Sequence, residues 1–247
     1  MCTLKKMTGH ACHNDTCRDP CAFETTDEED EPDPTEEEEV QRASWFKALG
    51  EAAAPTSVDD VFVVIDTETA SLKGPVVQVG LVAARISSGG EPFARYTCLW
   101  KYREVAGHKW DKRAEGIHGI SKDTLEDRGV SVRHGVEALR EILDGVRNSE
   151  VTLVAHNYSF DARMLNTTAI INKLPPLLKS ERSFCTMQAS RRAFGKRLRN
   201  EDLYEKLIGE KHTLGITHDA LVDAEITAAS YAAGITSRDF ACGGEAP

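Results

Sequence analysis

The sequence predicts an α/β fold in which helices flank a mixed sheet of five strands and a disordered tail precedes the sheet. Two runs, Val61–Ile65 and Val151–Ala155, are almost wholly apolar, as expected of strands that are buried on both faces. A helical apolar stripe over Val132–Val146 lies between them. A strand that follows such a helix runs parallel to the strand before it, so both runs belong in the centre of one sheet.

The strands of the first half are expected to form an antiparallel meander, because only short turns separate them. Lys73–Pro75 and the glycine-rich segment Ser87–Pro92 supply these turns. The three expected strands are Val61–Asp66, Val76–Ile86 and Phe93–Tyr102.

The second half is expected to alternate helices with two further strands. Ser121 is the candidate N-cap of a short helix, and Pro175 ends a helix that begins near Tyr158. Gly234 is the candidate C-cap of the last helix. Besides the strand Val151–Ala155, the expected elements are a strand at Arg182–Met187 and helices at Gln188–Phe194, Glu201–Ile208 and Asp219–Ala233.

We expect three regions: residues 1–57 as a mostly disordered N-terminal region, 58–235 as the folded domain and 236–247 as a flexible tail. Four cysteines and two histidines within the first 21 residues suit Zn²⁺, but their spacing lacks a C-x2-C half. A cysteine-rich tail without metal is therefore the favoured alternative. The acidic segment that follows is expected to be disordered to about residue 42, before a short helix over Gln41–Ala54.

The formal net charge of −10 is concentrated in one segment. Glu24–Glu39 holds eleven acids and no Lys or Arg, and without it the charge is +1, which does not exclude a nucleic-acid substrate. Seven cysteines, of which four lie in the first 21 residues and three are scattered, do not form a disulfide framework for the core and favour a reducing compartment. The sequence shows no secretory signal and no apolar run of membrane length, so we expect an intracellular protein of the cytoplasm or nucleus, without membrane contact.

Acidic residues follow the two central strands where those strands end. Asp66 and Glu68 are two positions apart, so they point the same way on a strand. Asp161 falls in the first turns of the helix after the second apolar run. The last helix opens with His218 and places Asp223 one turn further on. Because such ends converge on one crevice of an open α/β sheet, we expect these five side chains to meet.

Four carboxylates and a histidine suit the metal-dependent hydrolysis of phosphodiesters. Buried carboxylates repel one another unless a cation lies between them, and closely spaced oxygen ligands suit Mg²⁺ or Mn²⁺. Two ions ~3.5–4 Å apart can stabilise the attacking and the leaving oxygens. An imidazole ionises near neutral pH and can accept the proton of the attacking water. The D-x-E pair alone also fits solvated acids at a strand end, so the other motifs decide.

Together these segments resemble the DEDD, or DnaQ-like, superfamily of 3′→5′ exonucleases, in its histidine-containing DEDDh branch. The resemblance covers about residues 58–235. The matching segments are DTET at Asp66–Thr69, IHGI within Ala114–Ser121, HNYSFD at His156–Asp161 and H-x4-D at His218–Asp223. The chain departs from the usual pattern at Ala70–Ser71, where members often have Thr-Gly, and at Gln78, where they often have Glu. These departures concern the shape of the terminal-base pocket and not the metal ligands.

The resemblance implies a ribonuclease H-like fold and release of nucleoside 5′-monophosphates from 3′ ends. It also implies two Mg²⁺ or Mn²⁺ ions, with His218 as the general base. The implied ligands are Asp66, Glu68, Asp161 and Asp223. By the same likeness, the backbone at Thr69 and Ala70 meets the terminal nucleotide.

Other residues are candidates for substrate contact, each with a structural alternative. Asn157 can bind a phosphate, and Phe160 can stack on a base, although an aromatic beside a strand end is more often core. His118 lies near the substrate or satisfies loop backbone groups. Arg197 and Arg199 belong to a basic run that contacts phosphates or forms a solvated face. His156 is interpreted as structural.

The leading function is a 3′→5′ exonuclease, with DNA slightly favoured over RNA because the IHGI segment resembles that of proofreading members. The alternative is an exoribonuclease that trims single-stranded RNA; whether the pocket demands a 2′-hydroxyl decides between them. Further alternatives are an inactive nucleic-acid-binding module and a scaffold whose N-terminal region recruits a partner. The expected partners are single-stranded nucleic acid or frayed 3′ ends, together with a polymerase or another replication or repair protein.

Overall fold

The computed structural model describes residues 36–53, 60–105, 107–179, 181–215 and 218–240. The zinc interpretation of the N-terminal cysteines, most of the acidic segment and the last residues of the tail lie outside this part of the chain. No helix in these ranges is both long and apolar enough to cross a membrane.

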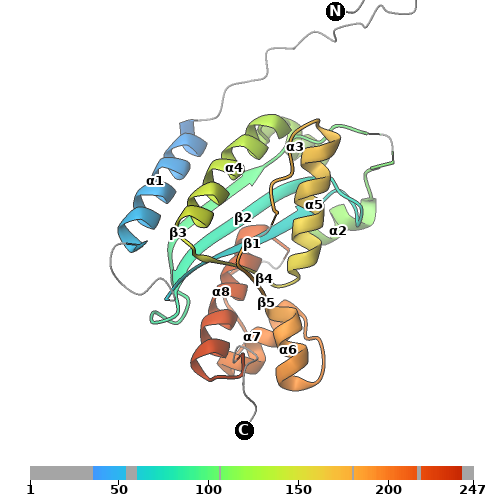
Figure 1. The fold of residues 1–247 in the computed structure, drawn as a ribbon. Helices are drawn as coiled ribbons and strands as arrows, with labels where there is room; N and C mark the ends of the chain where they lie inside the picture. The colour runs from blue at the N-terminus through green and yellow to red at the C-terminus, as the bar shows by residue number, and fades with distance from the viewer. Residues whose placement is uncertain (1–35, 54–59, 106, 180, 216–217, 241–247) are drawn as a thin grey trace, which may run out of the picture. The chain divides into compact units, whose positions relative to one another are not determined.

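A mixed five-stranded sheet forms the centre of the fold, in the order β3-β2-β1-β4-β5 (Figure 1). The strands are β1 (Val61–Thr69), β2 (Val76–Arg85), β3 (Pro92–Leu99), β4 (Thr152–Ala155) and β5 (Ser183–Cys185). β1, β2 and β3 form the expected antiparallel meander, and β4 pairs parallel to both β1 and β5. The predicted α/β class, the strand count and the central parallel pair are confirmed.

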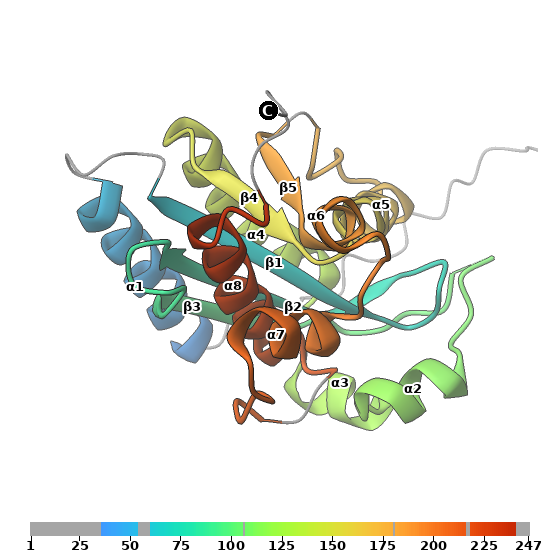
Figure 2. The same cartoon turned by 90° about the horizontal axis from the view of Figure 1, so that it is seen from below.

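Helices cover both faces of this sheet. The helices are α1 (Glu36–Ala53), α2 (Lys112–His118), α3 (Lys122–Arg128), α4 (Val132–Asn148), α5 (Tyr158–Ile171), α6 (Thr186–Phe194), α7 (Asn200–Ile208) and α8 (Ala220–Thr236). One apolar cluster joins the sheet to α1, α4 and α5, and a second joins its other face to α6, α7 and α8. The two groups of helices lie on opposite sides of the strands in Figure 2.

The apolar run of β1 explains this three-layer arrangement. Val63 and Ile65 pack in the first cluster, whereas Phe62 and Val64 pack in the second. Because side chains alternate along a strand, only an unbroken apolar run can supply both cores. The strand therefore lies in the interior of the fold. Its carboxyl end is polar, and the candidate site lies at that end.

Helix α1 begins earlier than the sequence predicts, at Glu36 rather than Gln41. The acidic segment was expected to be disordered to about residue 42, and that expectation is wrong for Glu36–Gln41. Glu38 is buried, and its carboxylate accepts a hydrogen bond from the Tyr96 hydroxyl at 3.2 Å. Trp45 and Leu49 then seat the helix in the first cluster. Tertiary contacts therefore outweigh the repulsion between neighbouring acids.

Two helix ends also differ from the prediction. Helix α2 was not expected; Asp111 caps its start by accepting the Arg113 N–H, and Gly119 ends it in the left-handed region at φ 71°. Gly234 does not cap the last helix, because α8 continues to Thr236. A β-carbon at Gly234 would lie 2.3 Å from the Phe240 ring, so close packing is the reason for this glycine. Ser121 caps α3 as predicted.

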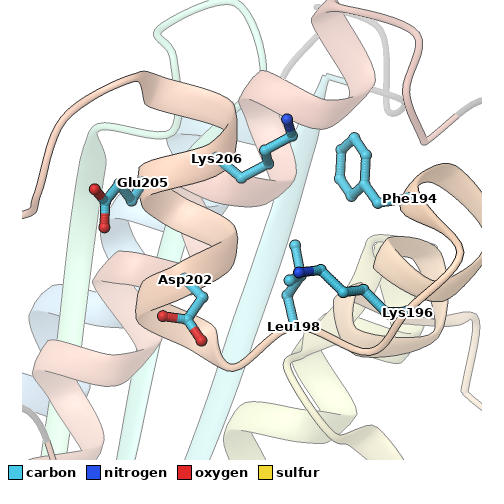
Figure 3. A pocket seen from close by; sticks show the side chains of 6 residues that line it. All are labelled: Phe194, Lys196, Leu198, Asp202, Glu205 and Lys206. Atoms are coloured by element: carbon cyan, nitrogen blue, oxygen red, sulfur yellow. The ribbon is translucent and has the colours of Figure 1, made fainter.

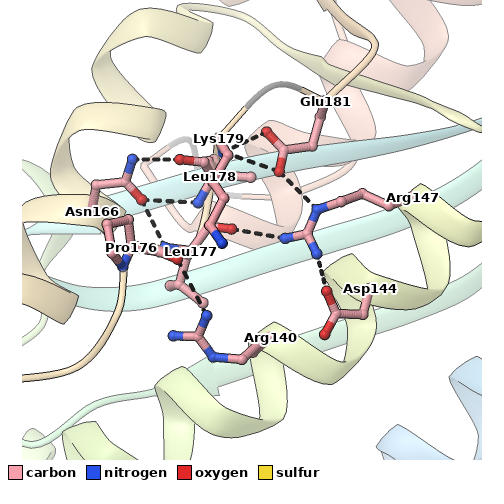
Figure 4. Close-up of polar contacts among 9 residues, drawn as sticks. All are labelled: Arg140, Asp144, Arg147, Asn166, Pro176, Leu177, Leu178, Lys179 and Glu181. Atoms are coloured by element: carbon pink, nitrogen blue, oxygen red, sulfur yellow. Dashed lines mark hydrogen bonds and ion pairs between the residues drawn. The ribbon is translucent and has the colours of Figure 1, made fainter.

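Hydrogen bonds to α4 and α5 hold the connection between α5 and β5 in place (Figure 4). Arg147 donates to the Leu177 carbonyl at 2.8 Å and to Glu181 at 2.9 Å. Asn166 accepts the N–H groups of Leu177 and Leu178 at 2.8 and 2.9 Å. This network fixes the path of the chain into β5, and therefore the start of α6 beside the site.

Candidate active site

All five motif residues line one cavity of about 550 Å³ at the carboxyl ends of β1 and β4. The lining also includes four of the expected substrate contacts: Asn157, Phe160, Arg197 and Arg199. It therefore joins residues from β1, α5, the connection between α6 and α7, and α8, which are far apart in the sequence.

The first two carboxylates come from the end of β1. Asp66 and Glu68 lie on the same side of the strand, as the alternation of side chains predicts. The strand register pairs them with Gly80 and Gln78 of β2. Thr67 lies between them and donates its hydroxyl hydrogen to Asp161 Oδ1 at 2.8 Å. This hydrogen bond ties the second motif directly to the first.

Asp161 lies in the first turn of α5, and its side chain is buried. Only two residues separate α5 from the strand β4, so the parallel pairing of β1 and β4 brings Asp161 to the end of β1. The positive end of a helix dipole favours a carboxylate in this position.

The third motif begins one residue before the N-cap of α8. The His218 N–H donates to Asp223 Oδ2 at 3.1 Å, and the His218 ring nitrogen Nδ1 lies 4.0 Å from the same oxygen. His218 has a left-handed φ of 67°, which is unusual for a residue with a β-carbon, and its side chain is half exposed. Ligand atoms of Glu68, His218 and Asp223 all lie within 4.8 Å of one another.

Burial and mutual repulsion favour the protonated form of these carboxylic acids. Burial raises the pKa of Asp66 well above its usual value, and the charges of Asp161 and Asp223 raise it further. Burial, followed by the Asp223 and Asp161 charges, raises the pKa of Glu68 to about 8. Burial also raises the pKa of Asp161 to about 7 and raises that of Asp223. Such a cluster is a favourable site for divalent cations, which would replace protons as its counter-charge.

Three other expected substrate contacts do not line the cavity. Thr69 and Ala70 are buried, and the Ala70 carbonyl accepts the Asp111 N–H at 2.8 Å. The ring of His118 packs edge-on against Trp110 at a centroid distance of 6.4 Å, and its Nδ1 accepts the Ile120 N–H. Burial lowers the pKa of His118, and the nearby charge of His218 acts in the same direction.

His156 lines the cavity and connects two parts of its wall. Its Nε2 lies 3.1 Å from the Leu198 carbonyl, which can only accept, so Nε2 carries the hydrogen. Its Nδ1 lies 3.0 Å from the Thr186 hydroxyl. Burial lowers the pKa of His156 to about 4, so the ring is neutral near pH 7. These contacts agree with the structural interpretation of this residue.

The sequence did not single out several other residues of the wall. Asn200 donates to the Asp223 carbonyl at 3.0 Å, and Glu201 forms an ion pair with Arg199. Met187 and Leu198 add apolar surface. A helix start at about residue 200 was foreseen, but the packing of α7 on α8, which brings Asn200 and Glu201 to the site, was not.

A second cavity, of about 880 Å³, lies between α6 and α7 and shares Leu198 with the first (Figure 3). Its lining holds Phe194, two lysines and two carboxylates, with Lys206 over the Phe194 ring. Opposite charges balance in this lining, and it includes no histidine and none of the motif carboxylates. The smaller cavity is therefore the one with the groups needed for chemistry.

Comparison with known proteins gives a consistent result. The RNase_T family model, described as exonuclease, matches residues 63–231, and no curated protein matches the chain. The structure of exonuclease X in complex with 5′ overhanging duplex DNA is 26% identical, with a TM-score of 0.52, over 72% of this chain and 93% of that one.

Two further structures share the fold at lower identity. The nuclease domain of 3′hExo, a DEDDh family member bound to rAMP, is 16% identical with a TM-score of 0.56, over 73% of this chain and 94% of that one. E. coli exonuclease I in complex with a 5cy-dT13 oligonucleotide is 17% identical with a TM-score of 0.57, over 74% of this chain and 42% of that one.

Proposed function

The chain belongs to the RNase_T exonuclease family and is a 3′→5′ exonuclease of the DEDDh branch, and we propose that its four cavity carboxylates hold two Mg²⁺ or Mn²⁺ ions. The proposed ligands are Asp66, Glu68, Asp161 and Asp223, with His218 as the general base. The family match confirms the resemblance that the motifs predicted, and the likeness to solved structures confirms the ribonuclease H-like fold.

The convergence of four carboxylates in one cavity carries this proposal. Their raised pKa values reflect charges that repel one another in a buried place, and the hard oxygen ligands suit Mg²⁺ or Mn²⁺. When bound, the ions would neutralise this charge and stabilise the oxygens that gain charge during hydrolysis. The protein's own part is to hold Asp66 and Glu68 on a rigid central strand and Asp161 and Asp223 on helices that pack against the sheet.

His218 is suited to move a proton at the edge of the cavity. Its half-exposed ring can receive a hydrogen from the attacking water and release it to solvent. The hydrogen bond from its backbone N–H to Asp223 holds the residue beside the carboxylates. We expect the proton to pass from the attacking water to a ring nitrogen of His218 as the phosphodiester bond breaks.

Arg197 and Arg199 are the proposed phosphate contacts. Both are exposed at the cavity wall, on either side of Leu198. The backbone of Leu198 is held twice, because its carbonyl accepts from His156 and its N–H donates to the Ser190 hydroxyl at 3.1 Å. Because Leu198 is held in place, its neighbours Arg197 and Arg199 would both direct their guanidinium groups toward the phosphates of a substrate. Asn157 and Phe160 would contact the terminal nucleotide from α5 and the residue that precedes it.

Replacement of both Arg197 and Arg199 by Ala should weaken binding of single-stranded nucleic acid and flatten its salt dependence. Each lost phosphate contact removes ~0.7 from the slope of log affinity against log salt concentration. The matched control is Arg191→Ala with Arg192→Ala, which removes the same charge from exposed positions of α6 outside the cavity lining. Equal slopes for the two double variants, measured by fluorescence anisotropy, would remove these arginines from the substrate path.

DNA is the slightly favoured substrate, in keeping with the IHGI segment and with the likeness to exonuclease X in complex with DNA. RNA is the alternative, and the likeness to 3′hExo bound to rAMP keeps it open. A polymerase or repair protein as partner also belongs to this proposal. The expected boundary at residue 57 does not, because α1 packs in the same apolar cluster as the sheet, and the expected boundary at residue 235 falls within α8.

Digestion of 5′-labelled single-stranded DNA and RNA of one sequence tests the function. We expect a ladder that shrinks from the 3′ end with Mg²⁺ or Mn²⁺, that is absent in EDTA and that falls at least ~10²-fold in Asp66→Ala. The faster polymer identifies the substrate class. Cleavage that persists in EDTA or in Asp66→Ala would contradict the proposal.

A further inference from the structure

Gln78 lies on β2, between the strand β1, which bears the first motif, and the helix α8, which bears the third. The strand register places it opposite Glu68, and only 5% of its surface is exposed. Its Nε2 donates to Asp219 Oδ2 at 2.9 Å, and its Oε1 accepts the Ala220 N–H at 3.1 Å. A carboxylate can only accept and a backbone N–H can only donate, so these partners fix the orientation of the amide.

The backbone of α8 lies directly on β2 at the same place. A β-carbon at Gly80 would lie 2.3 Å from the carbonyl carbon of Ala220, so only glycine permits this approach. Gly80 pairs with Asp66 in the strand register, as Gln78 pairs with Glu68. Gln78 and Gly80, which lie opposite the carboxylates of the first motif, therefore both contact Ala220, the first residue of α8.

Asp219 connects β2 to the residues of the third motif through its hydrogen bonds. Its Oδ1 accepts the N–H groups of Leu221 and Val222 at 3.0 and 3.2 Å, which caps α8, while Oδ2 accepts from Gln78. Its backbone carbonyl accepts the Asp223 N–H at 2.9 Å. His218 precedes Asp219 directly in the chain. The side chain of Asp219 is thus bonded both to β2 and to the turn that bears Asp223.

We propose that Gln78 is a positioning residue, which holds the start of α8 on β2 and so sets the distance of Asp223 and His218 from Glu68. This inference rests on the proposed function, because it assigns those three residues to catalysis. A displacement of about 1 Å in such a site can cost on the order of 10²-fold in rate. The effect should fall on kcat rather than on KM, because Gln78 does not line the cavity.

An exchange of the two hydrogen-bonding groups tests the proposal. Gln78→Glu sets two carboxylates against each other, and Asp219→Asn sets two amide donors against each other. The double variant, Gln78→Glu with Asp219→Asn, restores one donor and one acceptor in reversed order. We expect each single variant to lower kcat ~10- to 100-fold with KM within about twofold of wild type. The double variant should recover to within about fivefold of wild type, because the two sites are directly coupled.

Mn²⁺ binding gives a readout that does not depend on turnover. The rise in melting temperature on addition of Mn²⁺ should shrink in each single variant and return in the double variant, because the ligands regain their positions. If Gln78→Glu does not fold, Gln78→Met replaces it, since Met has a similar length and makes neither hydrogen bond. Its matched control is Gln41→Met, which removes a glutamine of α1 that accepts the Thr97 N–H of β3 and is bonded there instead of to the start of α8.

Each remaining outcome decides the question. Wild-type kcat in folded Gln78→Glu or Gln78→Met, or no recovery in the folded double variant, would overturn the positioning role. Equal losses of kcat in Gln41→Met and Gln78→Met would also overturn it, by showing a general effect of stability. Absence of metal-dependent cleavage in the wild-type protein would instead contradict the proposed function. The positioning role of Gln78 would then be tested by the Mn²⁺-induced change in melting temperature alone.

Discussion

At the scale of a single residue, Glu68 shows that a carboxylate of this site lowers the stability of the metal-free fold. Burial and the neighbouring Asp223, Asp161 and Asp219 charges raise its pKa to about 8. In the metal-free protein the folded state therefore disfavours ionised Glu68. Ionised Glu68 therefore costs the metal-free fold stability, as expected of the metal ligand that we propose it to be.

The metal-free protein should lose stability as pH rises. A carboxyl group whose pKa is higher in the folded than in the unfolded state stabilises the fold below its unfolded pKa, and that contribution is lost as pH rises through its folded pKa. For Glu68 the window runs from 4.5 to about 8. In EDTA we therefore expect the melting temperature to fall across this window.

Glu68→Gln is the matched control, because it keeps the shape of the side chain and removes the titrating group. Its melting temperature should fall less steeply, and near pH 8 it should exceed that of the wild type while activity is lost. A wild-type melting temperature that is flat over the window, or the same slope in Glu68→Gln, would contradict the assigned repulsion.

The motif acids could be predicted from the sequence, because their spacing along a strand or helix already places them on one side. The hydrogen-bond partners of Gln78 and His156 could not be predicted. Gln78 bonds to Asp219 and His156 to Leu198, and only the tertiary fold brings those partners together. His118 gave a motif signal, but its ring packs against Trp110 outside the cavity lining.

At the scale of elements, the contact of β2 with α8 is the junction on which the third motif depends. Gly80→Ala should destabilise the protein by ~1–3 kcal/mol, because the added methyl group would overlap the backbone of Ala220. Chemical denaturation measures this free energy of unfolding. The same change at Gly50, within α1 and with open space at its β-carbon, should instead stabilise by ~0.5–1 kcal/mol. Equal effects at the two positions would refute the close approach.

The long elements were predictable because each has a clear period or apolar run. The strands β1 and β2 and the helix α4 differ from the prediction by at most a few residues at their ends. Helix α2 was missed because none of its residues is buried, so it carries no apolar stripe. The early start of α1 depends on the burial of Glu38 against β3, a long-range contact that no local pattern reveals.

At the scale of the whole molecule, α1 belongs to the same compact unit as the sheet. Trp45 and Leu49 are buried in the first apolar cluster. Removal of residues 1–53 should therefore lower the free energy of unfolding by ~3–6 kcal/mol, from the loss of these two side chains alone.

Removal of residues 1–35 is the control truncation, because it leaves α1 intact. We expect it to preserve both the melting temperature and the rate of 3′ cleavage. If the two truncations behave alike in thermal unfolding, α1 is not part of the stabilising core. A loss of cleavage in the shorter truncation would favour the alternative in which the N-terminal region acts in recruitment.

The central claim is that the four carboxylates bind two divalent ions, and calorimetric titration of Mn²⁺ into the metal-free protein tests it most directly. With a nucleoside 5′-monophosphate present, we predict about two ions per wild-type chain. Asp66→Asn should lose at least one of them, whereas Asp127→Asn, at an exposed acid of α3 outside the lining of the carboxylate cavity, should bind as the wild type does. No Mn²⁺ binding by the wild type, or full binding by Asp66→Asn, would contradict the account.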